Sequence, residues 1–155
     1  MDSQVQTLVR ALQLAPHPEG GFYRRIHTAT GQVQANGRVR PAETAIDYLL
    51  PGGVQSRWHR IDASETWQWL QGDALQLSLF DAGADALTCH RLHPPSGDPA
   101  SQAVMAGVWQ SARSQGDYSL MRCTVTPGFV WEGFEMLASD HDVALRLRQL
   151  GQALP

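Results

Sequence analysis

An all-β fold with a short helix at each end is the structure that this chain of 155 residues predicts. Short segments rich in β-forming residues recur along its middle, and clusters of Gly, Pro and Asp divide them. Apolar residues at helical spacing occur only near the two ends. Many short strands separated by turns are typical of a β sandwich or barrel. A chain of this length suffices for one domain, residues 1–155, with a sizeable core.

The elements follow from local patterns. The first helix has apolar residues at helical spacing from Val5 and ends before Pro16. The second begins with Ser139 or Asp140 as its cap and ends at Gly151. A strand begins at Phe22 or Tyr23 after the glycine pair. Six further strands are expected at residues 44–50, 65–71, 75–80, 86–92, 102–108 and 118–126.

Composition excludes several classes of protein. The net charge is −3 and the pI is about 6.0, and the basic residues are scattered along the chain, which argues against a nucleic-acid partner. No apolar run approaches the ~20 residues of a membrane span. The N-terminal residues do not follow the pattern of a signal peptide, so we expect a cytoplasmic protein. Cys89 and Cys123 are expected to be reduced core residues.

One segment carries the main chemical signal, with Gly53, His59, Glu65 and Gly72 at regular intervals. In a half-buried hairpin, residues two apart share a face. His59 and Ile61 therefore point one way on the first strand, and Glu65, Trp67 and Trp69 share a face on the next. A histidine and a carboxylate that meet inside a barrel can bind a metal or transfer protons.

Several segments together resemble one family. They are 17–25 (HPEGGFYRR), the region of 44–50 (TAIDYLL), the motif from His59 to Asp73, the run Gly107-Val108-Trp109-Gln110, and Cys123 to Phe129. The chain is identified on these motifs as a member of the Cupin_5 family of the cupin superfamily. The resemblance implies a cupin double-stranded β-helix, or jelly-roll, barrel over roughly residues 20–138. It also implies a homodimer.

The chain departs from the cupin metal motifs at two of the four ligand positions. Ile61 stands at the second histidine of the first motif, and Gln110 stands at the ligand position of the second. His59, Glu65 and Gln110 remain as a metal set, and one histidine, one carboxylate and one amide form a weak site for a transition metal. We therefore expect a pocket without a metal or another cofactor.

In such a pocket His59 and Glu65 would form a hydrogen-bonded pair. The carboxylate favours the imidazolium form and burial opposes it, and the sequence leaves the balance open. His59 would be the catalytic base, with Glu65 orienting it. The alternative is a polar pair that only completes the core, although a buried carboxylate is costly without a partner.

Other residues are candidates for ligand contact. Glu19 is interpreted as an acceptor in the turn before the first long strand. Alternation predicts that Phe22 and Arg24 share one face and Tyr23 and Arg25 the other. Tyr23 or Arg24 could lie at the barrel mouth, where an arginine would hold an anion. Trp67 is the candidate for stacking on a flat ligand, and Gln110 is a further ligand-binding candidate. Residues 129–136 are expected to form a lid or a subunit contact.

Three functions fit these residues. The first is a metal-independent isomerase or epimerase acting on a sugar or nucleotide-like small molecule, with His59 removing a proton beside a carbonyl. The second is a metal-dependent, dioxygenase-like enzyme that uses His59, Glu65 and Gln110. The third is a protein that binds a small ligand without catalysis. The cupin fold hosts all three.

Overall fold

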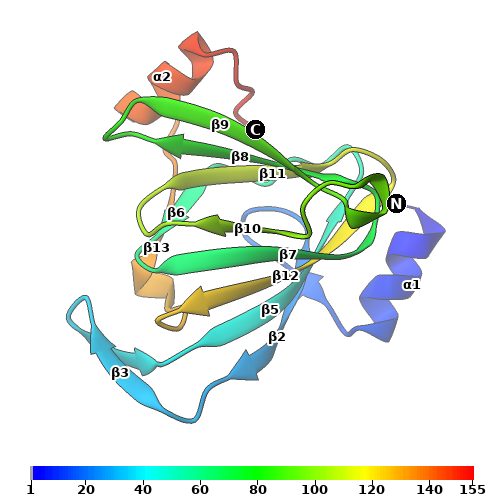
Figure 1. Cartoon of the computed structure of the whole chain (residues 1–155), viewed down its shortest axis with the longest axis horizontal. Coiled ribbons are helices and arrows are strands. Elements are labelled where there is room, and N and C mark those ends of the chain that lie inside the picture. Colours follow the sequence, from blue (N-terminus) through cyan, green and yellow to red (C-terminus); the bar gives the residue numbers. More distant parts are fainter. Residues whose placement is uncertain (1) are drawn as a thin grey trace.

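Two antiparallel sheets face each other across the interior of the computed structural model, which describes residues 2–155 (Figure 1). The six-stranded sheet has the order β1 (Ala15–Pro16), β2 (Phe22–Thr28), β5 (Thr44–Pro51), β12 (Tyr118–Thr126), β7 (Ser64–Gly72), β10 (Ser101–Val104). The five-stranded sheet has the order β13 (Phe134–Met136), β6 (His59–Ile61), β11 (Trp109–Ser114), β8 (Leu75–Asp81), β9 (Ala86–Leu92). The arrangement confirms the expected all-β barrel.

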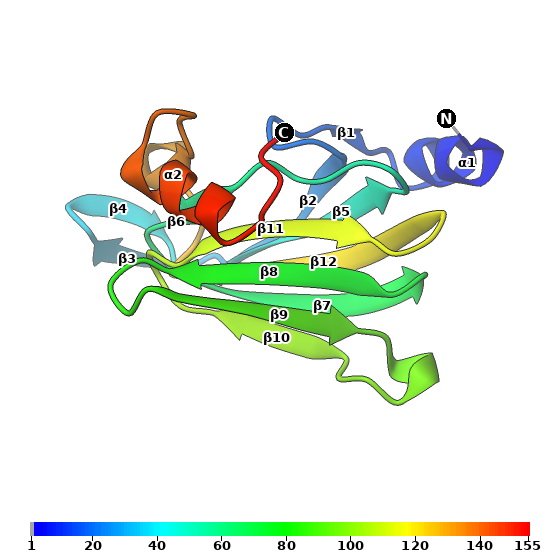
Figure 2. The same ribbon diagram turned by 90° about the horizontal axis from the view of Figure 1, so that it is seen from above.

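Two helices lie on the same side of the strands, near opposite ends (Figure 2). Helix α1 (Ser3–Ala11) inserts Val5 among buried side chains of β5 and β12. Helix α2 (Asp142–Gln149) covers the buried tryptophans Trp58 and Trp109. Both helices therefore add small cores outside the barrel and leave its interior to the strands.

The remaining elements are short. Strands β3 (Gln32–Ala35) and β4 (Arg38–Pro41) form a separate hairpin that projects from the barrel (Figure 1). Two 3-10 turns, η1 (Pro94–Ser96) and η2 (Trp131–Gly133), lie in the loops. No helix within residues 2–155 combines the length and apolar character that a membrane crossing requires.

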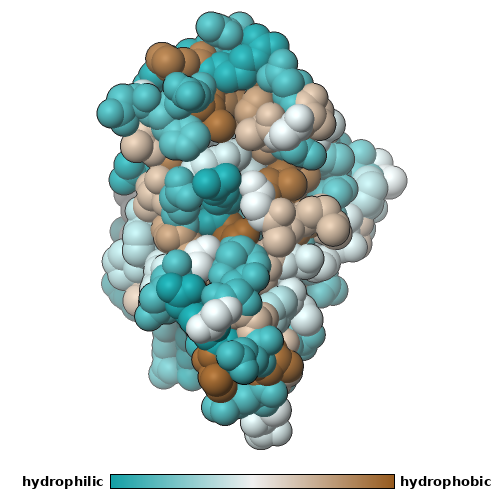
Figure 3. Space-filling view, turned by 90° about the vertical axis from the view of Figure 1, so that its left-hand side faces the viewer, coloured by the Kyte–Doolittle hydropathy of each residue, from teal (hydrophilic) through white to brown (hydrophobic). Residues whose placement is uncertain are grey.

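The surface around the hairpin, η2 and α2 is mixed. On the face shown in Figure 3, apolar residues form separate patches divided by polar ones. Val39 and Met105 are each 67% exposed, and Trp131 is 47% exposed. Scattered exposed apolar residues are normal on a protein surface. The predicted homodimer stays a prediction.

Several sequence predictions need correction. The segment 102–108 is not one strand: β10 ends at Val104, the chain turns through Gly107 with φ 81°, and β11 begins at Trp109 in the other sheet. The cap of α2 is His141, whose Nδ1 accepts the Val143 N–H, and not Ser139 or Asp140. Both cysteines are free, but Cys89 is exposed rather than part of the core.

Candidate functional site

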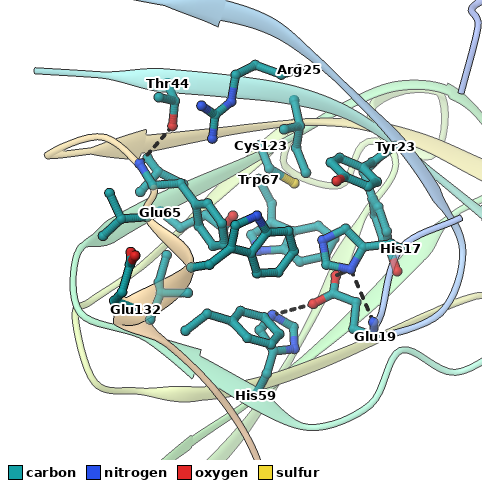
Figure 4. A pocket seen from close by; sticks show the side chains of 18 residues that line it. His17, Glu19, Tyr23, Arg25, Thr44, His59, Glu65, Trp67, Cys123 and Glu132 are labelled. Carbon is teal, nitrogen blue, oxygen red and sulfur yellow. Dashed lines mark hydrogen bonds and ion pairs between the residues drawn. The ribbon is translucent and has the colours of Figure 1, made fainter. Parts of the chain in front are cut away.

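A cavity of about 520 Å³ opens into the barrel between the two sheets (Figure 4). One row of paired residues crosses the six-stranded sheet on its wall: Arg25 pairs with Ile46, Ile46 with Cys123, and Cys123 with Trp67. Side chains at paired positions of neighbouring strands lie on the same face. The row therefore places a cation at one side of the cavity and an indole at the other.

Glu19 enters the cavity from the turn between β1 and β2. Gly20 and Gly21 have φ values of 102° and 74°, which L side chains rarely adopt. A Cβ on Gly21 would lie 2.7 Å from the Leu49 carbonyl oxygen, so glycine is required there. The backbone carbonyl of Glu19 accepts the Arg57 N–H at 2.7 Å. The turn directs the Glu19 side chain into the cavity, and the residue is only 4% exposed.

The Glu19 carboxylate pairs with His59 from β6. The Nε2 of His59 lies 2.8 Å from Glu19 Oε2, and its Nδ1 lies 2.8 Å from the carbonyl oxygen of Arg57. A carbonyl and a carboxylate only accept hydrogen bonds, so both ring nitrogens carry protons. His59 is therefore an imidazolium with both N–H groups engaged.

The electrostatics agree with this protonation. Burial disfavours the charged form of His59, but the charge and hydrogen bond of Glu19 outweigh it and raise the pKa of His59 to about 9. Burial also opposes ionisation of Glu19, but the adjacent imidazolium lowers the pKa of its carboxyl. The two groups form a buried ion pair at neutral pH.

Glu65 from β7 has a different kind of partner. Its Oε1 accepts the Gln110 Nε2–H at 2.8 Å, and Gln110 Oε1 accepts the Trp67 Nε1–H at 2.7 Å. Because an indole N–H can only donate, this chain fixes which end of the amide faces Glu65. Among residues 2–155, Glu65 Oε2 accepts no hydrogen bond within normal distance and angle, although the nearby Trp67 N–H favours the ionised carboxylate.

A neutral amide compensates a carboxylate less than an imidazolium does. Burial raises the pKa of Glu65 to about 7, since the favourable charge of His59 only partly opposes it and Glu19 adds to it. A carboxyl group with a pKa near neutrality can both take and give a proton under physiological conditions. Glu65 is therefore the titrating group of the cavity at neutral pH.

His17 is a third polar side chain of the cavity wall. Its Nδ1 accepts the backbone N–H of Glu19 at 3.1 Å, so this nitrogen carries no proton and Nε2 does. Burial lowers the pKa of His17, which keeps the ring neutral. The side chain is 7% exposed, and within the described residues its Nε2–H has no acceptor. Figure 4 shows the ring beside Glu19 on the cavity wall. The result is an unused hydrogen-bond donor.

A lid segment, residues 129–134, covers part of the cavity. Phe134 stacks on the His59 ring with centroids 5.3 Å apart, and Trp131 lies 5.5 Å from Phe134. Buried Arg40 anchors the base of the lid: its Nε donates to the Gly128 carbonyl at 2.7 Å, and its other nitrogens donate to Asp62. These contacts keep aromatic side chains over the charged pair.

The predicted metal set does not fit a transition metal. Such an ion needs several nitrogen, oxygen or sulfur donors with free lone pairs. Both nitrogens of His59 donate hydrogen bonds, and the amide oxygen of Gln110 is taken by Trp67. Within residues 2–155, no three His, Cys, Asp or Glu side chains are grouped to hold a metal ion.

The structure brings most of the predicted site residues to one cavity. His59, Glu65, Tyr23 and Trp67 line its wall. Gln110 is fully buried behind the wall, where it contacts Glu65.

Two interpretations need correction. Arg24 and Arg25 are both exposed, but Arg24 lies on the face of β2 away from the cavity, whereas Arg25 lines the cavity on the same face as Tyr23. His59 and Glu65 do not hydrogen-bond to each other, and Glu19 is the partner of His59 rather than a turn acceptor.

Sequence reasoning missed His17 and Glu19 as site residues. Both stand before the glycine pair, about 40 positions from His59 along the chain, and only the tertiary fold brings them to it. Their signal was a polar pair directly before two glycines that have to adopt left-handed backbone conformations. Such a turn can direct a carboxylate into the barrel although its residue does not belong to a strand.

Comparisons with known proteins agree with this fold. The model of the family Cupin_5, described as "Cupin superfamily (DUF985)", matches residues 6–137, so the chain belongs to this family. A hypothetical protein from Leishmania major is 27% identical, with a TM-score of 0.79 over 94% of this chain and 90% of that one. A Shewanella oneidensis protein is 26% identical, with a TM-score of 0.83 over 94% and 92%. The search of curated proteins finds no match.

More distant structures share the fold alone. Oxalate decarboxylase from Bacillus subtilis is 10% identical, with a TM-score of 0.62 over 89% of this chain and 34% of that one. The formate complex of Lactobacillus farciminis oxalate decarboxylase is 13% identical, with a TM-score of 0.60 over 90% and 39%. These similarities confirm the cupin jelly-roll barrel and carry no activity over to this chain.

Proposed function

We propose that this cupin is a metal-independent enzyme that transfers a proton beside a carbonyl group, as isomerases and epimerases of small sugar-like molecules do. Glu65 is the acid and base of this proposal. The observation that carries the proposal is its place: a buried carboxyl group on the cavity wall with a neutral amide as its hydrogen-bond partner. Burial raises its pKa to about 7, and the efficiency of a general base is greatest when its pKa lies near the working pH. Its open oxygen faces a cavity large enough for a small molecule.

His17 supports the same reaction as an electrophile. Removal of a proton beside a carbonyl places negative charge on the carbonyl oxygen, and a fixed donor stabilises that charge. A neutral imidazole with a free Nε2–H can supply such a hydrogen bond. The proton moves from the substrate carbon to Glu65, which leaves an enediolate. Its return from Glu65 to the neighbouring carbon, with transfer of the hydroxyl proton to the former carbonyl oxygen, gives the isomer, whereas return to the same carbon regenerates the substrate.

His59 has a different task from the one that its motif position suggests. An imidazolium with both N–H groups engaged cannot accept a proton from a substrate. With Glu19 it supplies a fixed ion pair, and its positive charge limits how far the pKa of Glu65 rises. We therefore assign proton transfer to Glu65 and positioning to His59.

Deuterium exchange tests this proposal without knowledge of the natural substrate. The protein is incubated in D₂O at pD 7 with a panel of ketoses, aldoses and 2-oxo compounds, and NMR follows loss of the proton beside each carbonyl. We expect exchange in at least one compound, and no exchange above background with E65Q. A panel in which several compounds bind and none exchanges would instead favour a ligand-binding protein without catalysis.

A further inference from the structure

We infer that the ligand of this cavity is a small organic anion, whose carboxylate or phosphate group is held by Arg25. This inference rests on the proposed function, since it names the substrate class of the same site. It starts from the one arginine on the cavity wall within residues 2–155.

Arg25 combines two properties: it lines the cavity from the exposed part of β2, and its guanidinium has no partner among residues 2–155. Within the part of the chain that the structure describes, its side chain makes no ion pair or hydrogen bond. Ion pairs to carboxylates occupy five other arginines: Arg40, Arg60, Arg91, Arg122 and Arg146. Figure 4 shows the Arg25 side chain reaching from β2 toward the cavity. A planar guanidinium with free N–H groups is suited to bidentate contact with a carboxylate or phosphate.

The geometry of the sheet sets the size of the ligand. Arg25 belongs to the same row as Trp67, three strands away, and Glu65 lies two residues from Trp67 on β7. Three strand spacings correspond to roughly 14 Å between backbones. The long side chains of Arg25 and Trp67 line the same cavity, which shortens the distance that a ligand has to span. A molecule that touches both spans several ångströms, which fits a monosaccharide acid, a sugar phosphate or an aromatic acid.

The charges that face the ligand favour an anion near Arg25. The Glu19 carboxylate is paired with His59, so that pair contributes little net charge. Glu65 is partly protonated at neutral pH. Glu132 on the lid is the remaining acid of the wall and makes no ion pair with Arg25 in residues 2–155. Figure 4 shows Glu132 and Arg25 on different sides of the cavity.

The interior between these groups suits a planar or apolar ligand body. Ile46 and Trp67 lie in the row of Arg25, and Phe129 and Phe134 of the lid line the same cavity. Ligand cavities commonly combine such an apolar lining with a few polar groups that fix orientation. An anionic group at Arg25 would place the ligand body along this row, with its far end near Glu65.

Matched probes and matched variants test the inference. Benzoate and phenyl phosphate are the anionic probes and benzamide is their neutral counterpart; each is titrated into the full-length protein at pH 7 and followed by NMR. R25Q removes the cavity guanidinium. R24Q changes the net charge equally on the opposite face of the same strand and is the control.

We expect at least one anion to bind the wild type and R24Q about tenfold more tightly than benzamide, which is the size of one charge-assisted contact. In R25Q that preference is lost, while benzamide binding is unchanged. Preference for one anion over the other identifies the group as a carboxylate or a phosphate. The inference is overturned if neither anion binds, if R25Q keeps the preference, or if R24Q loses it equally.

E65Q separates this inference from the proposed function. The variant keeps Arg25 and removes the titrating carboxyl, so the anion preference should persist while deuterium exchange is lost. If E65Q still catalyses exchange, the proposed role of Glu65 fails and the R25Q result stands by itself. If exchange depends on Glu65 but R25Q binds benzoate normally, the substrate class is wrong and the function stands.

Discussion

Glu19 and Glu65 are two buried carboxyl groups of one cavity, yet their surroundings drive them in opposite directions. Glu19 is 4% exposed and Glu65 is 8% exposed. The partner of Glu19 is an imidazolium at 2.8 Å, and its pKa is lowered. The partner of Glu65 is a neutral amide at 2.8 Å, and burial raises its pKa to about 7. Similar burial therefore does not give the two carboxyl groups similar pKa values.

The difference shows how this barrel separates structural charge from reactive charge. An ion pair satisfies both members and leaves neither free to exchange protons near pH 7. A carboxyl group that is held by one amide hydrogen bond keeps an open oxygen and a poised pKa. His59 and Glu65 both stand at metal-ligand positions of the cupin motif. Here His59 belongs to the ion pair with Glu19, and Glu65 on β7 is the carboxyl group held by an amide.

The largest expected effect is on proton transfer. E65Q should lower the deuterium exchange rate at least about 100-fold, because it removes the acid and base while keeping the size of the side chain. Exchange is measured by NMR at saturating concentration of the responsive compound. The matched control is E43Q, which removes an exposed carboxylate that does not line the cavity and should change the rate less than threefold, by about 0.7 kcal/mol or less. Equal losses in both variants would contradict the assignment.

Breaking the ion pair should have the largest effect on stability. E19Q leaves the His59 imidazolium buried without a counter-charge, which costs about 3–5 kcal/mol in comparable buried pairs. Urea denaturation at pH 6 measures the loss. E43Q is the control, because Glu43 is 45% exposed and lies 3.6 Å from His27, a surface pair worth about 0.5 kcal/mol or less. Similar stabilities of E19Q and the wild type would show that the pair is not ionised.

An intermediate effect is expected at His17. H17F keeps an aromatic ring against Tyr23 but removes the Nε2–H donor. Exchange should fall about 10- to 100-fold, in the range of one lost oxyanion donor or less. The binding of benzoate should change little. H17Q offers an amide N–H at a similar reach and should restore part of the rate. A rate that is unaffected in H17F, or unrescued in H17Q, would indicate a purely structural ring.

A further effect concerns the dependence of stability on pH. A folded-state pKa of about 7 against an ordinary value of 4.5 means that Glu65 supports folding below pH 4.5, and that this support is lost as the pH rises through 7. His59, with a pKa raised from 6.5 to about 9, loses its contribution between those values. E65Q should therefore match the wild type at pH 4.5 and exceed its unfolding free energy by roughly 3 kcal/mol at pH 8. Urea denaturation at both values checks the difference, and a wild type that is more stable than E65Q at pH 8 would contradict it.

Much of the fold was accessible from the sequence because its strands have strong local signals. Alternation on β7 correctly placed Glu65 and Trp67 on the buried face. Strand β11 was missed because its sequence WQSARS is polar, although its residues are mostly buried. Small serine side chains are buried there through hydrogen bonds such as Ser111 Oγ to the Ser56 carbonyl, at 2.6 Å. Hydrophobic patterning cannot detect burial of that kind.

The site was accessible only in part. His59 and Glu65 belong to a motif with fixed spacing. Alternation along β2 places Arg25 on the same face as Tyr23, and both line the cavity, whereas the predicted Arg24 does not. The partner of His59 was out of reach, because the choice between Glu19 and Glu65 depends on which carboxylate lies within hydrogen-bond distance. That distance is set by the turn at Gly20 and by the Arg57 backbone contact, which join distant segments.

The carboxyl titrations of Glu65 and Glu19 test the central claim most directly. With ¹³C-labelled glutamate, NMR follows each carboxyl carbon from pH 3 to 9, and E65Q and E19Q identify the two signals. The account predicts that Glu65 titrates near pH 7 and that Glu19 titrates below its ordinary value of 4.5. A Glu65 that titrates near 4.5, or a Glu19 that titrates above it, would contradict the division of the two carboxylates into a reactive and a structural one.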